Sequence, residues 1–222
     1  MTTKQGLIER TKQGLHAALI EELPPVAAEA SILDIGCGTG AWLERLADLH
    51  FSNLYGVDLD LQQVKSERAK IFQLNLDQDE IPSFGIEQFD LITAIELIEH
   101  LENPGRLFFH ISTLLKPDGY ILLTTPNIHS LIARLRFLLS GQLRGFDEKG
   151  DPTHIYPVYL KCLKRILLRY DLEIVKISTY PKRGSITSRK ALMLAAHILS
   201  FLLDDELSGD NLFLLIRRRN LT

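Results

Sequence analysis

Short apolar runs alternate with amphipathic stretches through the first 125 residues of the chain. This alternation is typical of repeated β-α units, in which the apolar runs form parallel strands and the amphipathic stretches form helices on both faces of the sheet. The pattern therefore predicts a doubly wound α/β fold with a mostly parallel sheet. The expected strands are residues 31–35, 53–57, 71–74, 89–95 and 120–124, and the expected helices are residues 41–49, 60–69 and 104–115.

The alternation breaks after residue 127, where an amphipathic helix is expected at residues 130–139 and a polar, glycine-containing loop at residues 141–152. Ligands of open α/β sheets bind beyond the carboxyl ends of the strands. Residues 128–153 are therefore predicted to form a helical lid or a substrate-recognition insertion, and a helix that only packs on the sheet is the alternative. After the insertion we expect a helix at 158–169 and strands at 172–177 and 211–216.

The length of 222 residues and the 45% hydrophobic content fit one globular domain, residues 1–222, because no linker-like stretch divides the chain. Two cysteines do not make a disulfide framework, and the N-terminus lacks an apolar signal core, so a cytoplasmic location is expected. No run reaches the roughly 18 apolar residues of a membrane span. The apolar stretch at residues 191–203 is expected to be a buried helix or an interface.

Charge is distributed unevenly between the two halves of the chain. Residues 1–111 hold 8 lysines and arginines against 18 aspartates and glutamates, whereas residues 112–222 hold 17 against 10. A basic patch in the second half would suit an anionic substrate or peripheral contact with a membrane surface. Scattered solvated charge is the favoured interpretation of the same residues, which are Arg134, Arg136, Arg144, Lys149, Lys182, Arg183, Arg189 and Lys190.

A glycine-rich turn follows the first expected strand, with glycines at positions 36, 38 and 40. Glycines at this spacing permit positive φ angles and let a ligand approach the backbone closely. The turn also satisfies the loose dinucleotide fingerprint, whose pyrophosphate sits at a helix N-terminus. Asp34, two residues before the first glycine, would repel a pyrophosphate but suits a ligand that carries an ammonium and a sulfonium. The acid therefore favours S-adenosylmethionine.

This Asp-x-Gly-x-Gly-x-Gly turn and the residues after it resemble the class I S-adenosylmethionine-dependent methyltransferases, over about residues 31–177. The resemblance implies a Rossmann-like sheet of seven strands that ends in an antiparallel strand. It also implies a cofactor site at the carboxyl edge of that sheet. The turn and the end of the fourth strand contribute Asp34, Gly36, Cys37, Gly38, Gly40 and Ile95 to this expected site.

The second expected strand ends at Asp58, which lies 24 residues after Asp34. This is close to the roughly 20-residue offset at which a carboxylate accepts ribose hydroxyls, so Asp58 is the expected ribose ligand and Leu59 would pack on the adenine. A helix N-cap is the alternative role for Asp58. Asn75 and Leu76 after the third strand are expected at the adenine, with Asp77 as the alternative acceptor from the adenine amine.

The fourth expected strand delivers Glu96, Glu99 and His100 to the carboxyl edge. If the chain turns helical at Glu96, the three side chains share one face and can converge on a divalent cation, either magnesium or a first-row transition metal. Glu-x-x-Glu-His resembles the ubiquinone-biosynthesis-type O-methyltransferases and the small-RNA 3′-terminal 2′-O-methyltransferases, in which these residues hold a metal. His154, after the insertion, is the candidate fourth ligand.

A site without metal is the alternative, in which His100 acts as a general base or only bonds the backbone, and His129 is a weaker base candidate. Neutral alcohols are poor nucleophiles at pH 7, so a base or a metal beside the methyl group favours an oxygen acceptor. The expected function is O-methylation of a small hydroxylated molecule, such as a quinol precursor or a glycan sugar. RNA 2′-O-methylation is disfavoured, because the chain has no appended RNA-binding module and its net charge is acidic. A non-catalytic S-adenosylmethionine-binding protein remains a further alternative.

Overall fold

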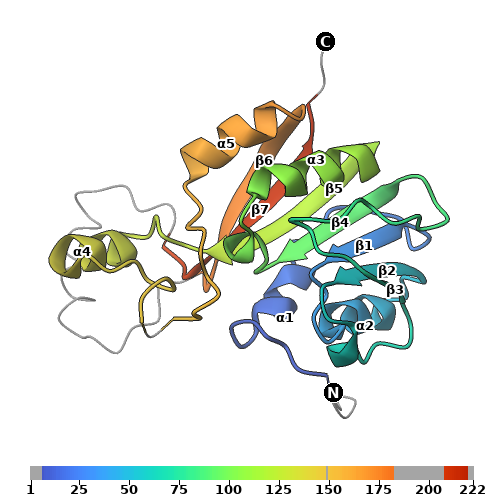
Figure 1. Cartoon of the computed structure of the whole chain (residues 1–222), viewed down its shortest axis with the longest axis horizontal. Coiled ribbons are helices and arrows are strands. Elements are labelled where there is room, and N and C mark those ends of the chain that lie inside the picture. The colour runs from blue at the N-terminus through green and yellow to red at the C-terminus, as the bar shows by residue number, and fades with distance from the viewer. Residues whose placement is uncertain (1–6, 149, 183–207, 220–222) are drawn as a thin grey trace.

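The computed structural model describes residues 7–148, 150–182 and 208–219. Seven strands of the described chain form one sheet in the order β3-β2-β1-β4-β5-β7-β6 (Figure 1). Neighbouring strands are parallel up to β5, and β7 runs antiparallel to both β5 and β6. The strands are β1 (Ser31–Ile35), β2 (Asn53–Asp58), β3 (Lys70–Gln73), β4 (Phe89–Ile95), β5 (Leu115–Pro126), β6 (Leu172–Tyr180) and β7 (Asn211–Arg218).

Helices cover both faces of this sheet. The helical elements are α1 (Leu15–Ile20), α2 (Ala41–Asp48), α3 (Pro104–Leu114), α4 (Leu131–Ser140), α5 (Leu160–Leu168) and the short 3₁₀ turns η1 (Leu61–Gln63) and η2 (Ile98–His100). Helices α1 and α2 bury their apolar residues on one face, and α3 and α5 bury theirs on the other (Figure 1). Alternation along β1 divides its residues between the two cores, because Ile32 faces α1 and α2 whereas Leu33 and Ile35 face the opposite side.

The doubly wound α/β fold and its mostly parallel seven-stranded sheet with a C-terminal antiparallel strand are confirmed. Strands β1 and β4 have the predicted bounds, and β5 is longer than predicted because Leu115 already pairs with Phe89. The pairing then shifts register between Phe89 and Leu91, so residues 116–119 of β5 form an irregularity in the β4–β5 ladder. Helix α1 was not predicted.

The predicted helix at residues 60–69 is wrong. Only η1 forms there, with the Asp60 side chain accepting a hydrogen bond of 3.0 Å from the Gln62 amide. Beyond it the chain is irregular and bound to other elements: the Lys65 amide donates to the Thr39 carbonyl at 2.9 Å, and the Ser66 hydroxyl donates to Glu44 at 2.8 Å. These contacts with α2 and its preceding loop replace the hydrogen bonds that a helix would make.

The insertion at residues 128–153 contains α4 and the loop that follows it, and α4 lies to the side of the sheet in Figure 1. Ser130 caps α4 by accepting from the Ala133 amide at 3.2 Å. The loop then returns to the sheet edge, because the Ile155 and Tyr156 amides both donate to the Glu99 carbonyl, at 2.8 and 2.9 Å. These two bonds place the end of the insertion beside η2.

Several basic residues of the second half are held in ion pairs. Arg136 pairs with Asp147, and Arg144 pairs with Asp210 at 2.6 Å. The apolar stretch at residues 191–203 lies outside the described residues, as do Lys149, Arg183, Arg189 and Lys190. Within the part of the chain that the structure describes, no helix has the length and hydropathy needed to cross a membrane.

Candidate functional site

The glycine-rich turn joins β1 to α2 and is fastened to β2. Gly36, Gly38 and Gly40 all have positive φ angles, of 75°, 53° and 82°. The amides of Gly36 and Cys37 donate to the Val57 carbonyl at 2.8 and 3.0 Å. A Cβ atom on Gly38 would meet no atom within 4 Å, so the turn leaves open space at this position. A ligand can therefore lie directly against the backbone there.

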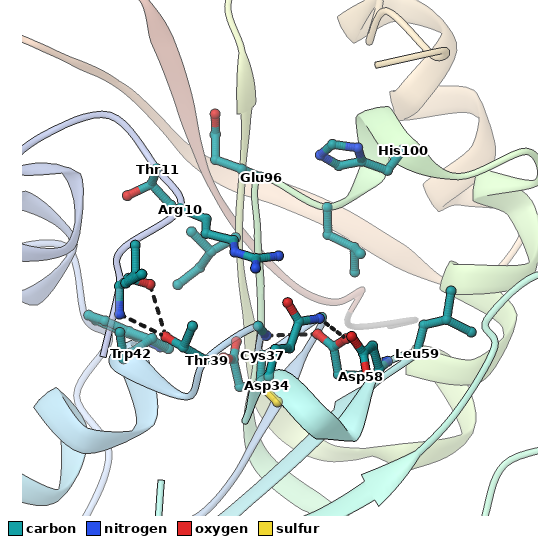
Figure 2. A pocket seen from close by; sticks show the side chains of 18 of the residues that line it. Arg10, Thr11, Asp34, Cys37, Thr39, Trp42, Asp58, Leu59, Glu96 and His100 are labelled. Atoms are coloured by element: carbon teal, nitrogen blue, oxygen red, sulfur yellow. Dashed lines mark hydrogen bonds between the residues drawn. The ribbon is translucent and has the colours of Figure 1, made fainter. Parts of the chain in front are cut away.

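A cavity of about 390 Å³ opens in front of this turn (Figure 2). Most of the residues predicted to bind the cofactor line it, namely Asp34, Gly36, Cys37, Gly38, Asp58, Leu59 and Ile95. Gly40 is not part of the lining. A Cβ atom on Gly40 would lie 2.6 Å from the Ser66 Cβ, so this glycine permits close packing at the start of α2.

Asp58, at the end of β2, is tied to the glycine turn. Its Oδ2 accepts from the Gly38 amide at 2.7 Å, and its Oδ1 accepts from the Asp60 amide and the Gln63 side chain, at 3.0 and 3.1 Å (Figure 2). The N-cap of η1 is Asp60. Asp60 therefore fills the N-cap position, which was the alternative role predicted for Asp58.

Asp34 is buried beneath the cavity, with 2% of its surface exposed. Its Oδ1 accepts a hydrogen bond of 2.6 Å from the Thr93 hydroxyl. Burial raises the pKa of Asp34 to about 7, and the nearby Asp58 charge adds to this effect. A cationic group in the cavity would favour the ionised carboxylate, so the position suits an ammonium ligand.

Cys37 also lines the cavity, and burial raises the pKa of its thiol further above the ordinary value. The thiol therefore stays protonated at neutral pH and acts as a small apolar wall.

The adenine candidates lie in an adjoining cavity of about 210 Å³, which shares Gly36, Asp58 and Leu59 with the first one. Asn75, Leu76 and Asp77 all line it. The Asp77 carboxylate accepts from the Glu102 and Asn103 amides at 3.2 and 2.9 Å, so it is committed to the segment before α3. Asn75 Oδ1 accepts only from the Asp77 amide, at 3.1 Å, among the described residues. This difference favours Asn75 over Asp77.

Glu96 does not take the helical position on which the four-ligand hypothesis depends. It has a positive φ of 48°, and η2 begins only at Ile98. Its side chain is therefore directed toward β5 and β7, where Oε1 accepts from Thr124 Oγ1 at 2.8 Å and Oε2 accepts from Asn211 Nδ2 at 2.6 Å. Burial raises the pKa of Glu96 to about 7. The expectation that Glu96 shares a helix face with Glu99 and His100 is wrong.

The structure does bring together Glu99, His100 and His154, each with a ligand atom within 4.8 Å of the others. Glu99 is fully buried, and neither of its carboxylate oxygens makes a hydrogen bond of good geometry within the described chain. Burial and the Glu96 charge raise its pKa well above the ordinary value, although the Thr125 hydroxyl acts in the opposite direction. A buried carboxyl without firm partners is costly, so this group needs a proton or a cation.

The rings of His100 and His154 meet edge to face, with centroids 4.7 Å apart and planes at 76°. His154 Nδ1 lies 2.8 Å from the Gly145 carbonyl, so Nδ1 carries the proton and Nε2 keeps its lone pair. The pKa of His100 is lowered by burial and by His154, which favours the neutral ring. His129 is elsewhere: its Nε2 accepts from the Leu160 amide at 3.2 Å, at the start of α5.

An N-terminal segment that the sequence did not mark completes the cavity. Ile8, Arg10 and Thr11 line it, and the Ile8 backbone exchanges two hydrogen bonds with the Thr39 hydroxyl, at 3.2 and 2.9 Å. Glu9 next to them pairs with Arg45 of α2. The Arg10 side chain extends over the cavity in Figure 2. No motif in residues 7–11 signals this role.

Solved proteins share this fold. A solved S-adenosylmethionine-dependent methyltransferase from Archaeoglobus fulgidus matches with a TM-score of 0.65 and 20% identity, over 94% of this chain and 95% of that one. A phosphoethanolamine N-methyltransferase from Haemonchus contortus, solved with S-adenosyl-L-methionine, matches with a TM-score of 0.64 and 16% identity, over 97% of this chain and 55% of that one. The protein thus has the fold of the class I methyltransferases.

The family model described as a methyltransferase domain matches residues 8–177, and the chain belongs to this family. Among curated proteins, a ubiquinone biosynthesis O-methyltransferase from Coxiella burnetii (strain RSA 331 / Henzerling II) is 38% identical over 136 residues, which cover 59% of this chain and 57% of that protein. The match therefore spans little more than half of that relative's length.

Proposed function

We propose that the protein transfers the methyl group of S-adenosylmethionine to a hydroxyl oxygen of a small acceptor. The observation that carries the proposal is the position of His100, which lines the cavity in front of the glycine turn and also belongs to the cluster with Glu99 and His154. Figure 2 draws its ring toward the open cavity. A donor site and a group that can accept a proton thus adjoin each other.

The residues of the first cavity fit the methyl donor. Asp58 suits the ribose hydroxyls, Asp34 suits the ammonium group, and the open backbone at Gly38 leaves room for the ligand chain. Leu59 and Leu76 offer apolar surface for the adenine, and Asn75 offers an acceptor for its amine. Ile95 then lies near the reacting methyl group, at the end of β4.

The donor atoms of the cluster also fit a divalent cation. Glu99 supplies a buried carboxylate without firm partners, and His154 supplies an oriented Nε2. A bound cation would lower the pKa of an acceptor hydroxyl. With Glu96 bound to Thr124 and Asn211, the remaining set of one carboxylate and two imidazoles suits a first-row transition metal better than magnesium.

The chain's own residues act on the acceptor in two ways. In the cluster without a cation, His100 can take the hydroxyl proton as the oxygen attacks, which makes the oxygen a competent nucleophile. The end of the insertion contributes Asp151 and Thr153 to the cavity wall, so we propose that residues 128–153 form the acceptor side of the site. Methyl transfer otherwise depends mainly on holding the oxygen, the methyl carbon and the sulfur in line.

The acceptor that we propose is a small hydroxylated aromatic molecule such as a quinol precursor. The name of the Coxiella burnetii relative supports this class, and a glycan sugar is the second candidate. Incubation with methyl-labelled S-adenosylmethionine and 4-methylcatechol tests the proposal, with 4-methyl-1,2-phenylenediamine as the matched nitrogen acceptor. We expect labelled product from the catechol alone. Transfer only to the diamine would contradict an oxygen acceptor. Binding of S-adenosylhomocysteine without transfer to catechols, sugars or RNA would favour a non-catalytic protein.

A further inference from the structure

Hydrogen bonds link the side chains of Asp151 and Thr153, at the end of the insertion, to the ring of His100. Asp151 Oδ1 accepts a hydrogen bond of 2.6 Å from the Thr153 hydroxyl, and Thr153 Oγ1 lies 2.9 Å from His100 Nδ1. The Thr153 amide also donates to Asp151 Oδ1 at 2.9 Å, which fixes the turn between these two residues. Although 53 positions separate Thr153 from His100, the bonds from Ile155 and Tyr156 to the Glu99 carbonyl hold the two segments together.

The hydrogen-bond donors and acceptors available on Asp151 and Thr153 determine which nitrogen of His100 is protonated. An ionised carboxylate only accepts, and a hydroxyl has a single proton to give. The hydrogen bond from the Thr153 hydroxyl and, to a smaller extent, the one from the Thr153 amide lower the pKa of Asp151, so its carboxylate is ionised at neutral pH. Since the hydroxyl proton lies toward Asp151, Thr153 Oγ1 must accept from His100, and Nδ1 must be the donor.

We propose that Asp151 and Thr153 are positioning residues that hold His100 in the tautomer with the proton on Nδ1 and the lone pair on Nε2. Nothing in the 96–100 motif specifies this choice, because a neutral imidazole can carry its proton on either nitrogen. The insertion thereby contributes directly to the chemistry. The catalytic consequence rests on the proposed function, whereas the tautomer itself does not.

A simple turn is the competing explanation for Asp151 and Thr153, because aspartate and threonine two residues apart often stabilise turns by side-chain bonds to backbone. A turn would leave the tautomer of His100 unchanged when the Thr153 hydroxyl is removed. His154 provides an internal control, since its Nδ1 is bound to the Gly145 backbone carbonyl and does not depend on the Thr153 side chain.

Long-range ¹H–¹⁵N correlation spectra of the full chain, labelled at histidine, report the protonated nitrogen of each ring. We expect His100 to carry its proton on Nδ1 in the wild type and in Thr153→Ser. In Thr153→Val, and in Asp151→Ala where the hydroxyl proton is free to turn toward the ring, the Nε2-protonated form should become populated. His154 should keep its proton on Nδ1 in every variant, which would also indicate that the insertion keeps its fold.

An Nε2-protonated His100 in the wild type, or an unchanged tautomer in Thr153→Val, would overturn the proposal. Spectra are also recorded with EDTA, because a cation bound to Nε2 of His100 would select the same tautomer. If EDTA moved the proton of His100 from Nδ1 to Nε2, the cation and not Thr153 would determine the tautomer. That result would likewise overturn the proposal. If the proposed function holds, Thr153→Val should lower kcat on the order of tenfold with little change in KM for S-adenosylmethionine, and Thr153→Ser should restore it. Failure of the catechol assay alone leaves the tautomer result standing.

Discussion

The Gly38 amide donates a hydrogen bond of 2.7 Å to Asp58 Oδ2 and so joins the turn after β1 to the end of β2. These two parallel strands are neighbours in the sheet, with Ile35 paired to Val57. The bond orients the carboxylate before any ligand arrives, so less ordering is required on binding.

Replacement of Asp58 by alanine should weaken binding of S-adenosylhomocysteine by roughly ten- to hundredfold, because hydrogen bonds from ribose hydroxyls to a carboxylate contribute about 1.5 to 3 kcal/mol. Titration calorimetry measures the change. Asp60→Ala is the matched control, since it removes the cap of η1 and a carboxylate of the cavity wall but keeps the carboxylate that is bonded to Gly38, and it should change the affinity a few fold at most. Equal losses in the two variants would contradict the ribose assignment.

Binding through Asp34 should depend on pH. The pKa of about 7 means that the carboxylate is largely protonated at pH 6 and largely ionised at pH 8. A cationic ligand amine prefers the ionised form, so the affinity for S-adenosylhomocysteine should be on the order of tenfold lower at pH 6 than at pH 8. Asp34→Asn should bind weakly at both pH values while keeping its fold. If Asp34→Asn showed the wild-type dependence of affinity on pH, the ligand amine would not bind at Asp34.

Valine at Gly38 and alanine at Gly40 should fail in different ways. The added side chain at Gly38 enters the open space of the cavity at a φ of 53°, so we expect a folded protein with much lower affinity for S-adenosylhomocysteine. Alanine at Gly40 meets the Ser66 Cβ at 2.6 Å and should lower the melting temperature instead. Calorimetry and thermal unfolding of both variants test the contrast. Wild-type affinity in Gly38→Val would show that the ligand does not lie against this turn.

The proposed cation should depend on Glu99 and not on Glu96. Glu99→Gln should abolish binding of Mn²⁺ or Zn²⁺ measured by calorimetry, and Glu96→Gln should retain it, because Glu96 is bound to Thr124 and Asn211. EDTA should then reduce methyl transfer while leaving S-adenosylhomocysteine binding nearly intact. If the unmodified protein binds neither ion, the cluster works without metal and His100 remains the base.

His16 should make the protein less stable in mild acid. Burial is the main cause that lowers its pKa to about 4, and its ring packs on Trp42 with centroids 5.5 Å apart. In the unfolded chain His16 becomes protonated below about pH 6.5, whereas in the folded protein it stays neutral down to about pH 4. The neutral, buried ring therefore contributes fully to the free energy of unfolding above about pH 6.5, and this contribution is lost as the pH falls toward 4. We expect the wild type to lose about 2 kcal/mol more than His16→Phe between pH 7.5 and pH 5, in urea unfolding. Parallel losses would exclude His16 as the cause.

The sequence predicted those elements whose pattern is local. Strands β1 and β4 are mostly apolar runs that the sheet buries almost completely, so their bounds could be predicted from the local sequence pattern. The helix at residues 60–69 failed because Ser66 and Arg68 bind Glu44, a long-range interaction that no local pattern signals.

The site was predictable where spacing determines it and was not predictable where backbone conformation does. Asp34, Asp58 and the glycines follow from a strand-turn-helix spacing. Glu96 was assigned to a helix face, and only its positive φ reveals that it turns away. The contributions of Arg10, Asp151 and Thr153 depend on tertiary contacts between segments far apart in the sequence, so composition and periodicity could not supply them.

The return of the insertion to Glu99 has a consequence for protein engineering. Residues 131–148 include α4 and most of its following loop, and none of them lines the cavity in front of the glycine turn, whereas Asp151 and Thr153 do. A graft that replaces residues 131–144 and retains residues 145–154, with the Gly145 carbonyl that orients His154, would exchange the outer part of the insertion without altering the donor cavity. If the insertion forms the acceptor side of the site as proposed, this outer part is a replaceable segment for directing one methyl-transfer scaffold toward new acceptors.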